Sequence, residues 1–304
     1  MLKNFTELQI LITGASGFVG QNLMPYLKQQ ALTCFPISLR DKWQSRMPAE
    51  YDVVIHLAGK AHDTKNTSAA SEYFEINTEL TKRLFDHFLN SDAKDFIYFS
   101  SVKAAADTVD ELLDEGVTPL PQTPYGQSKR QAEQYLNSQR LPPGKRLFIL
   151  RPCMIHGPGN KGNLNLLYKL VSKGIPWPLA AFDNRRSFLA IGNLNFIIKW
   201  ILKNPDVPGG IYHLADDDAL STNELIKLIG EASGKKPALW KIPRALISTA
   251  AKIGNRLHLP LNSERLKKLT ESYVVDNSKI KSALKIERLP VAAKEGLLRT
   301  LRSF

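Results

Sequence analysis

Three glycines, each separated from the next by two residues, follow the first apolar segment of the chain and constrain its fold more than any other feature. Residues 8–13 are apolar and predict a strand, and Gly14, Gly17 and Gly20 come directly after it. A helix is predicted next, over residues 19–30. A strand, a glycine loop and a helix in this order are typical of a dinucleotide-binding unit.

Each of the three glycines has a separate task in such a loop. Gly14 would make the tight turn, Gly17 would let the backbone approach a pyrophosphate, and Gly20 would let the helix pack closely on the strand. The diphosphate would lie at the helix N-terminus, where unpaired N–H groups favour an anion. The predicted cofactor site therefore also includes three neighbours of the glycines, namely Ser16, Phe18 and Val19.

Short apolar runs alternate with longer helical patterns through the first half of the chain. Because the runs have almost no polar alternation, we expect strands buried on both faces of a parallel sheet. The sequence thus predicts an α/β fold, a Rossmann-type doubly wound parallel sheet. The predicted strands are 33–38, 53–57, 96–100 and 146–150, and the predicted helices are 69–89 and 128–139.

The alternation stops at the loop His156–Gly162, and this predicts a second, smaller part of the chain. Residues 188–200 and 210–215 are expected to return to the sheet. We therefore predict a Rossmann domain of residues 1–158 plus 189–217. An interrupted C-terminal substrate-binding domain would contain residues 159–188 plus 218–304, with a cleft between the two.

Charge is distributed unevenly along the chain. Of the net charge of +12, residues 231–304 carry +10, from 16 Lys and Arg against six Asp and Glu. This excess could steer an anionic small molecule, attract an acidic membrane surface or belong to a solvated surface. The amphipathic segment 245–259, with Lys252 and Arg256, could rest on a membrane. No motif indicates nucleic-acid binding.

Two cysteines cannot form a disulfide framework, and no long apolar run predicts a transmembrane helix or a signal peptide. We expect a cytoplasmic protein without a metal site.

The end of the second predicted strand bears on the choice of dinucleotide. An acidic residue there would bind the ribose hydroxyls of NAD, whereas Ser38 and Arg40 suit the 2′-phosphate of NADP. We therefore favour NADP(H). Asp41 keeps NAD(H) as an alternative, should the strand end one residue later.

Tyr125 and Lys129 are four residues apart at the start of a predicted helix. They share a face of that helix, which follows the strand ending in Ser100 and Ser101. Both side chains can therefore point toward the end of that strand.

At this point the sequence resembles the extended short-chain dehydrogenase/reductase family, in its nucleotide-sugar epimerase and reductase branch. The resemblance covers essentially the whole chain. It is carried by the glycine loop, residues 52–59, Phe99-Ser100-Ser101, Tyr125-x-x-x-Lys129, residues 151–159 and residues 185–188.

The resemblance implies a role for each part of the site. Tyr125 would be the general acid/base, Lys129 would lower its pKa and hold the nicotinamide ribose, and Ser101 would orient the reacting oxygen. The remaining residues implied to bind the cofactor are Leu57, Ala58, Gly59, Asn77, Ser100, Pro152 and Met154.

A nucleotide sugar, with UDP as the expected nucleotide, is the implied substrate. Arg186 would grip its diphosphate, and Arg265 or Lys267 would supply a second cation. The other implied substrate contacts are Ser101, Val102, Lys103, Asn163 and Leu164. A homodimer is expected from the family.

Two outcomes of hydride chemistry at C4 of the hexose remain open. We favour reduction of a 4-keto sugar, because Arg40 suits an exchangeable NADP(H), over 4-epimerisation with retained NAD. Dehydration is disfavoured because Val102 and Lys103 stand where the family's dehydratases carry Asp-Glu. The further alternatives are a reductase of a non-nucleotide carbonyl compound and a non-catalytic nucleotide-sensing protein.

Overall fold

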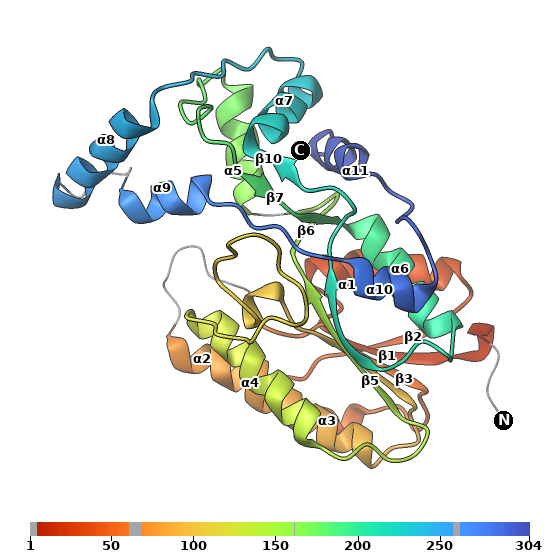
Figure 1. Cartoon of the computed structure of the whole chain (residues 1–304). Helices are drawn as coiled ribbons and strands as arrows, with labels where there is room; N and C mark the ends of the chain where they lie inside the picture. The colour runs from red at the N-terminus through yellow and green to blue at the C-terminus, as the bar shows by residue number, and fades with distance from the viewer. Residues whose placement is uncertain (1–4, 61–68, 161, 258–261) are drawn as a thin grey trace.

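The computed structural model describes residues 5–60, 69–160, 162–257 and 262–304. Six parallel strands form one sheet, with β1 lying between β2 and β3 (Figure 1). This confirms the predicted α/β fold with a doubly wound parallel sheet. In spatial order the strands are β2 (Thr33–Ile37), β1 (Gln9–Thr13), β3 (Val53–His56), β4 (Asp95–Phe99), β5 (Arg146–Pro152) and β9 (Gly210–Leu214).

Alternate residues of the sheet face two separate apolar layers. Ile10 and Ile12 of β1 pack in one core with helices α1, α6 and α10, whereas Leu11 packs in another with α3 and α4. Because both faces are covered, the central strands are apolar at nearly every position, as the sequence predicted. The five helices are α1 (Phe18–Gln29), α3 (Leu80–Leu89), α4 (Pro124–Ser138), α6 (Ile191–Lys203) and α10 (Ser278–Leu284).

The helix predicted over residues 69–89 is one continuous run with a wider turn in its middle. It consists of α2 (Ala70–Phe74), the π-helical turn η3 (Glu75–Glu79) and α3. Asn77 lies in the π-helical turn and is fully buried. Such turns often occur at functional sites, because they re-aim one side chain within a helix.

The expected return of residues 188–200 to the main sheet is wrong. Residues 188–190 form β8 (Phe188–Ala190), which pairs with β6 (Met154–His156) in a separate parallel pair, and α6 follows. Buried Ile191, Leu194, Ile198 and Ile201 recur at helical spacing, which explains the helix. The second expected return is confirmed, since residues 210–214 form β9 beside β5.

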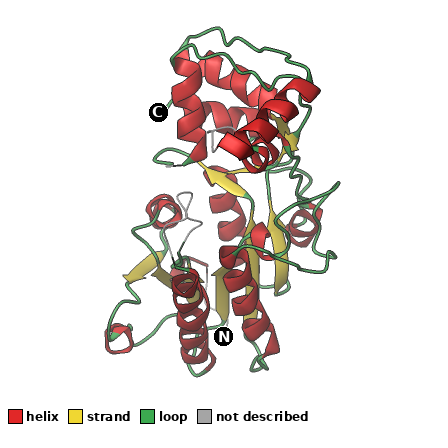
Figure 2. Cartoon of the chain, turned by 90° about the vertical axis from the view of Figure 1, so that its left-hand side faces the viewer, coloured by secondary structure: helices red, strands yellow, loops and turns green. Residues whose placement is uncertain are grey.

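A second lobe, mostly helical, lies above the carboxyl ends of the strands (Figure 2). It has its own apolar core, which includes Leu164, Ile226, Ile247 and Leu297. Its elements are α5 (Asn163–Ser172), α7 (Thr222–Ser233), α8 (Arg244–Leu257), α9 (Ser263–Thr270), α11 (Ala293–Leu301) and the antiparallel pair β7 (Arg185–Arg186) and β10 (Leu220–Ser221).

The division into two domains stays a proposal. Most of residues 218–304 pack in the helical lobe, but α10 packs on the sheet core with α6 and β9. In the described ranges, no helix is long and apolar enough to cross a membrane.

Candidate active site

The glycine loop has the backbone geometry that a bound diphosphate requires. Gly14 has φ +67°, and a Cβ there would lie 2.5 Å from the amide nitrogen of Ala58. A Cβ at Gly20 would lie 2.5 Å from Ala15 Cα, so α1 packs tightly on the loop. A Cβ at Gly17, in contrast, would meet only the carbonyl of Gly14, at 3.3 Å. Gly14 and Gly20 thus allow close packing, whereas Gly17 leaves space next to the loop backbone.

Helix α1 begins at Phe18 with its first N–H groups directed at this loop. No side chain in the described ranges caps it, and Gly17 has an extended conformation with φ −77°. An anion at the N-terminus of a helix satisfies such N–H groups and interacts favourably with the helix dipole. The residues of the loop therefore fit a dinucleotide diphosphate, with Phe18 and Val19 contributing through the backbone.

A buried chain of hydrogen bonds fixes the adjacent loop after β3. His56 Nδ1 lies 2.7 Å from Thr13 Oγ1, and His56 Nε2 lies 2.9 Å from Thr81 Oγ1. Thr13 Oγ1 in turn accepts a hydrogen bond from the Ala58 amide. Burial, with a smaller contribution from Lys129, lowers the pKa of His56 to about 3, so the imidazole is neutral. This chain holds Leu57, Ala58 and Gly59 against the glycine loop.

The start of α4 brings Tyr125 to Ser101. Thr123 caps the helix by accepting a hydrogen bond from the Gly126 amide at 3.2 Å. A Cβ at Gly126 would lie 2.4 Å from the carbonyl oxygen of Lys103, so a larger residue would push α4 away from the turn that follows Ser101. As a result, the side chains of Tyr125 and Ser101 share a hydrogen bond.

Lys129 is buried between the end of β4 and the loop after β3. Its Nζ donates to the carbonyl of Phe99 at 2.8 Å and lies 4.9 Å from the centre of the Tyr98 ring. A Cβ at Gly59 would lie 3.1 Å from the same nitrogen. Burial lowers the pKa of Lys129 to about 8, although Glu133 partly opposes this shift. The ammonium thus adjoins the predicted cofactor residues 57–59.

Asn77 holds the same loop to α4. Its Oδ1 accepts from the Lys60 amide at 2.7 Å, while its Nδ2 donates to the Lys60 carbonyl and to Ser128 Oγ. A Cβ at Gly59 would lie 2.9 Å from Asn77 Oδ1. The side chain of Asn77 therefore fixes the loop after β3 relative to α4.

One electrostatic expectation is wrong for the protein by itself. Lys129 was expected to lower the pKa of Tyr125. Burial instead raises the pKa of Tyr125; the hydrogen bond from Ser101 opposes the rise and Tyr73 adds to it. The phenol is therefore protonated at neutral pH, and it can give a proton more readily than it can take one.

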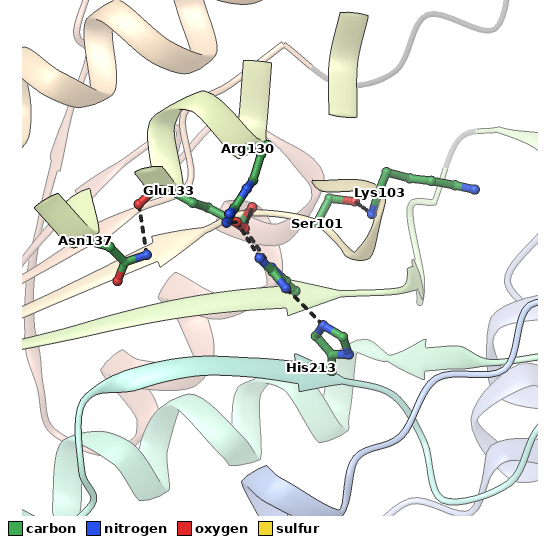
Figure 3. Close-up of polar contacts among 8 residues, drawn as sticks. Ser101, Lys103, Arg130, Glu133, Asn137 and His213 are labelled. Carbon is green, nitrogen blue, oxygen red and sulfur yellow. Dashed lines mark hydrogen bonds and ion pairs between the residues drawn. The ribbon is translucent and has the colours of Figure 1, made fainter. Parts of the chain in front are cut away.

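A buried ion pair ties α4 to β5 behind these residues (Figure 3). Arg151 donates to both carboxylate oxygens of Glu133, at 2.8 and 2.6 Å, and both side chains are almost fully buried. Arg151 also lies 3.4 Å from His213 Nε2 on β9, and Arg130 contacts Glu133 at 3.4 Å. The network connects β5 and β9 with α4, the helix that carries Tyr125 and Lys129.

The side chain of Ser100 belongs to this network, and a cofactor contact of this residue stays a prediction. Its hydroxyl donates to Glu133 Oε1 at 2.5 Å, and its amide donates to the carbonyl of Leu150. Successive residues of a strand point to opposite faces, and Ser101 therefore takes the side toward Tyr125 while Ser100 faces the interior.

A cavity of about 600 Å³ lies at the carboxyl end of β2. Arg40, Lys42 and Arg83 contribute three cationic side chains to its lining, and Asp41 and Glu75 contribute two acidic ones. The guanidinium of Arg46 donates to the carbonyl of Ser38 at 3.1 Å and so fixes the preceding turn, where Ser38 Oγ accepts from the Arg40 amide. The sequence prediction identified Arg40, but Arg83 comes from α3 and has no sequence signal.

Three cations gather where the helical lobe meets the turn after Ser101. Arg186 and Lys268 both lower the pKa of Lys103, although burial contributes more, and Asp107 and Glu271 oppose these effects. Lys103 Nζ donates to the Asp107 carbonyl and lies 4.1 Å from the centre of the Tyr273 ring. We call Lys103, Arg186 and Lys268 the cation cluster.

Backbone carbonyls of the helical lobe hold Arg186 in this position. Its guanidinium donates to the carbonyls of Glu271 and Lys268 at the end of α9. The extended segment that follows, residues 271–276, pairs with β7 and with Leu113 and so bridges the two lobes. Sequence reasoning chose Arg265 or Lys267 as the second cation. Lys268 instead lies close to Lys103, while Arg265 is an exposed residue of α9.

Several other predicted residues differ in how they can take part. Val102 packs in the sheet core and Leu164 in the core of the helical lobe, so a substrate contact of either residue, which stays a prediction, would use its backbone. Asn163 is exposed at the start of α5. Pro152 ends β5 and is buried, whereas Met154 begins β6 and is exposed.

Comparison with known proteins agrees with this geometry. The NAD dependent epimerase/dehydratase family model matches residues 10–215, and the chain belongs to this family. It is 29% identical to the UDP-glucose 4-epimerase of Vibrio cholerae over 97% of this chain and 95% of that protein.

Two further curated relatives carry other substrates in their names. The N-acetyl-alpha-D-glucosaminyl-diphospho-ditrans,octacis-undecaprenol 4-epimerase of Escherichia coli O157:H7 is 28% identical over 96% of this chain and 94% of that protein. The GDP-6-deoxy-D-mannose reductase of Pseudomonas aeruginosa is 26% identical over 73% and 79%. Among solved structures, RMD from Pseudomonas aeruginosa complexed with NADPH superposes with a TM-score of 0.74, covering 99% of this chain and 98% of that one at 21% identity.

Proposed function

We propose that the protein reduces a 4-keto sugar, transferring hydride to C4 of a hexose that is linked through a diphosphate. The observation that carries this proposal is the arrangement along α4, where Tyr125 shares a hydrogen bond with Ser101 and Lys129 lies against Gly59. Membership of a family named for epimerases and dehydratases agrees with it. Hydride transfer at C4 is common to a reductase and an epimerase. The proposal therefore has a general part, the roles of the side chains, and a particular part, the choice of cofactor.

In the general part, each side chain has one task. Ser101 hydrogen-bonds the oxygen on C4 and orients it, and Tyr125 gives that oxygen a proton as the carbonyl is reduced. Lys129, an ammonium below its pKa of about 8, holds the ribose next to the nicotinamide. The nicotinamide, when bound, supplies the hydride.

The particular part is the choice of NADP(H). Arg40, Lys42 and Arg83 make three cations at the carboxyl end of β2, the place where a 2′-phosphate would bind. A cofactor that leaves after each reduction suits a reductase. Asp41 and Glu75 in the same lining are the acidic residues that would favour NAD instead.

The cation cluster is the proposed site for the substrate diphosphate. Lys103 comes from the turn after Ser101 and Arg186 from the helical lobe, so a diphosphate bound to both would fix the sugar between them. UDP is the nucleotide we propose, because the Vibrio cholerae relative is a UDP-glucose enzyme. The Escherichia coli relative acts on a sugar whose diphosphate carries a polyprenol. That substrate likewise has a sugar linked to a diphosphate.

A 4-epimerase is the second candidate. Two relatives that match the chain over nearly its whole length, those from Vibrio cholerae and Escherichia coli, are 4-epimerases, and this observation favours the epimerase. An epimerase would oxidise C4, let the keto sugar turn and return the hydride to the other face, with the dinucleotide retained.

The test is incubation of the purified protein with NADPH and a UDP-4-keto-6-deoxyhexose. If the protein is a reductase, the absorbance of NADPH falls in proportion to the amount of keto sugar added. Interconversion of UDP-hexoses without added cofactor, and without NADPH consumption, would assign the epimerase instead. Arg186→Ala serves as the substrate-site variant, for which we expect KM to rise about 10- to 100-fold, the effect of losing a charge-assisted contact.

Two controls separate the remaining alternatives. UDP should raise the thermal midpoint of the wild-type protein and should do so less for Arg186→Ala. If UDP raises neither midpoint and both proteins reduce another carbonyl compound equally, the substrate is not a nucleotide sugar. If no carbonyl compound is reduced, yet the dinucleotide still stabilises the fold, the protein is a sensor.

A further inference from the structure

The surface that the proposed reaction leaves unused is the outer side of α8. Helix α8 packs on α9 and lies at the outer end of the helical lobe (Figure 1). Ile247, Ala251 and Gly254 are its buried residues, and they form one face. Apart from half-buried Ser248, the other residues of α8 are exposed, so the helix has a free side.

The free side of α8 is apolar along a stripe. Leu246, Ile253 and Leu257 are 62%, 51% and 64% exposed, and the small residue Ala250 is exposed between them. At 100° per residue these four positions fall within about 60° of the helix circumference. Three large aliphatic side chains on one exposed stripe differ from the single exposed apolar residues that are normal on protein surfaces.

Basic residues lie to one side of the apolar stripe. Arg256 and Lys252 are exposed at about 90° and 130° from the centre of the stripe, both on the side away from the buried face. From Lys235 to Thr270 the sequence has nine Lys and Arg and a single acidic residue, Glu264. Glu264 pairs with Lys268 on α9, so it does not neutralise the basic residues of α8.

Two more exposed apolar residues belong to the neighbouring segments. Trp240, which precedes α8, is 55% exposed, and Leu269 on α9 is 42% exposed. Tryptophan is enriched at membrane interfaces because its ring is apolar while its N–H seeks a polar partner. An apolar stripe bordered by Lys and Arg is the pattern of a helix that lies in the plane of a lipid surface.

We propose that helices α8 and α9 (residues 244–257 and 263–270), which we call the hairpin, dock on an anionic lipid bilayer, with Leu246, Ile253 and Leu257 entering the interface and the basic residues facing the headgroups. Charge complementarity favours this occupant. A second copy of the chain would bring the same positive charge to a symmetric contact and be repelled. A nucleic acid would match the charge but leave three aliphatic side chains without an apolar partner.

Docking would also orient the active site toward the membrane. Arg186 of the cation cluster donates to the carbonyls of Lys268 and Glu271, at the end of the same hairpin. The hairpin and the proposed diphosphate site are thus one continuous unit. The docking itself does not depend on the proposed reaction and is tested without it.

The test is flotation of the whole protein with vesicles. We expect the wild-type protein to float with vesicles of phosphatidylglycerol and phosphatidylcholine in equal parts, and to remain unbound with phosphatidylcholine alone. High salt should weaken the binding, since part of the attraction is electrostatic. The double variant Ile253→Glu, Leu257→Glu should reduce the bound fraction by about tenfold or more, because two apolar contacts become charges of the wrong sign.

Leu120→Glu is the matched control. Leu120 is 74% exposed outside the hairpin, and we expect this variant to float like the wild type. Both variants replace exposed residues, so circular dichroism and the thermal midpoint should match the wild type. NADPH consumption, measured in parallel, reports on the proposed reaction separately.

Three results would overturn the proposal. The first is no flotation of the wild type with anionic vesicles, and the second is equal flotation of the hairpin variant and the wild type. The third is a concentration-dependent dimer that the hairpin variant alone abolishes while vesicles bind neither protein; this would assign the stripe to a second copy of the chain.

Discussion

The sheet half and the helical lobe hold their charged groups in opposite ways. Around α4 the charged side chains are buried and satisfy one another, as Glu133 and Arg151 do, or donate to the backbone, as Lys129 does. In the helical lobe the ion pairs of Lys268 with Glu264 and of Arg299 with Glu295 are more than half exposed. Exposed pairs of this kind contribute little to stability, whereas a broken buried pair is costly.

This contrast suits two different roles, positioning in the sheet half and binding in the helical lobe. The buried network holds α4, with Tyr125 and Lys129, against β5, and the proposed proton transfer requires such fixed positions. The exposed cations of the helical lobe remain available to a diphosphate or a lipid headgroup. Substitutions in the sheet half should therefore alter the rate of chemistry or the stability of the fold, and substitutions in the lobe should alter binding.

The largest effect should come from Tyr125→Phe. This variant keeps the ring, which lies 6.2 Å from the Tyr73 ring, but removes the hydroxyl that shares a hydrogen bond with Ser101. Losing the general acid should lower kcat about 10²- to 10⁴-fold, with KM little changed. Steady-state kinetics with NADPH measures this. Retention of more than half of the wild-type kcat would contradict the role of Tyr125.

The next effect concerns stability. Glu133→Gln removes the charge that neutralises buried Arg151 and should lower the free energy of unfolding by about 3–5 kcal/mol. The double variant Glu133→Gln, Arg151→Met should regain much of this loss, because no uncompensated charge is left. Urea unfolding followed by circular dichroism is the measurement. As a comparison from the lobe, Glu295→Gln should cost less than about 1 kcal/mol.

A pH dependence of opposite sign for rate and stability should distinguish Lys129. The pKa of Lys129 in the folded protein is lowered to about 8, from 10.5. The rate should fall about tenfold per pH unit above 8, as the ammonium is lost. Between about 8 and 10.5 the unfolded chain binds more protons, so this group should raise the free energy of unfolding by about 1.4 kcal/mol per unit.

Lys129→Met tests both halves of that prediction. It should remove this group's contribution to the pH dependence of unfolding, measured by urea titration at several pH values. A wild-type rate that stays flat up to pH 10 would mean that Lys129 does not act through its charge.

The smallest effect should be on cofactor choice. Arg40→Ala removes one of three cations from the cavity beside β2 and should lower the preference for NADPH over NADH by about tenfold, the effect of one charge-assisted contact. Arg140→Ala, which removes an exposed arginine outside the cavity lining, is the matched control. An unchanged ratio of kcat/KM for the two cofactors in Arg40→Ala would favour NAD as the natural cofactor.

Much of the sheet half could be predicted from the sequence, because its signals are local. The glycine loop, the apolar strands and the four-residue spacing of Tyr125 and Lys129 each lie within one short segment. The helix over 191–203 was missed because a run such as Phe196-Ile197-Ile198 is apolar in either state, and only the longer spacing from Ile191 to Ile201 marks the helix.

The remaining site residues could not be predicted, since their partners are distant in the sequence. Ser100 and Ser101 are adjacent and chemically alike, and only Glu133, 33 residues from Ser100, shows which of the two faces the interior. Lys268 joins Lys103 because the segment after α9 crosses to the sheet half, and no periodic pattern announces this crossing. The requirement for glycine at position 126 is explained only by the carbonyl of Lys103, which a larger side chain would meet.

The most direct test of the central claim is to follow the hydride itself. The protein is incubated with NADPH dideuterated at C4 of the nicotinamide and a UDP-4-keto-6-deoxyhexose, and the product is analysed by proton NMR. We expect deuterium at C4 of the sugar with the wild-type protein and none with Tyr125→Phe over the same time. Turnover of NADPH with no deuterium at C4, or equal labelling by the two proteins, would contradict the account.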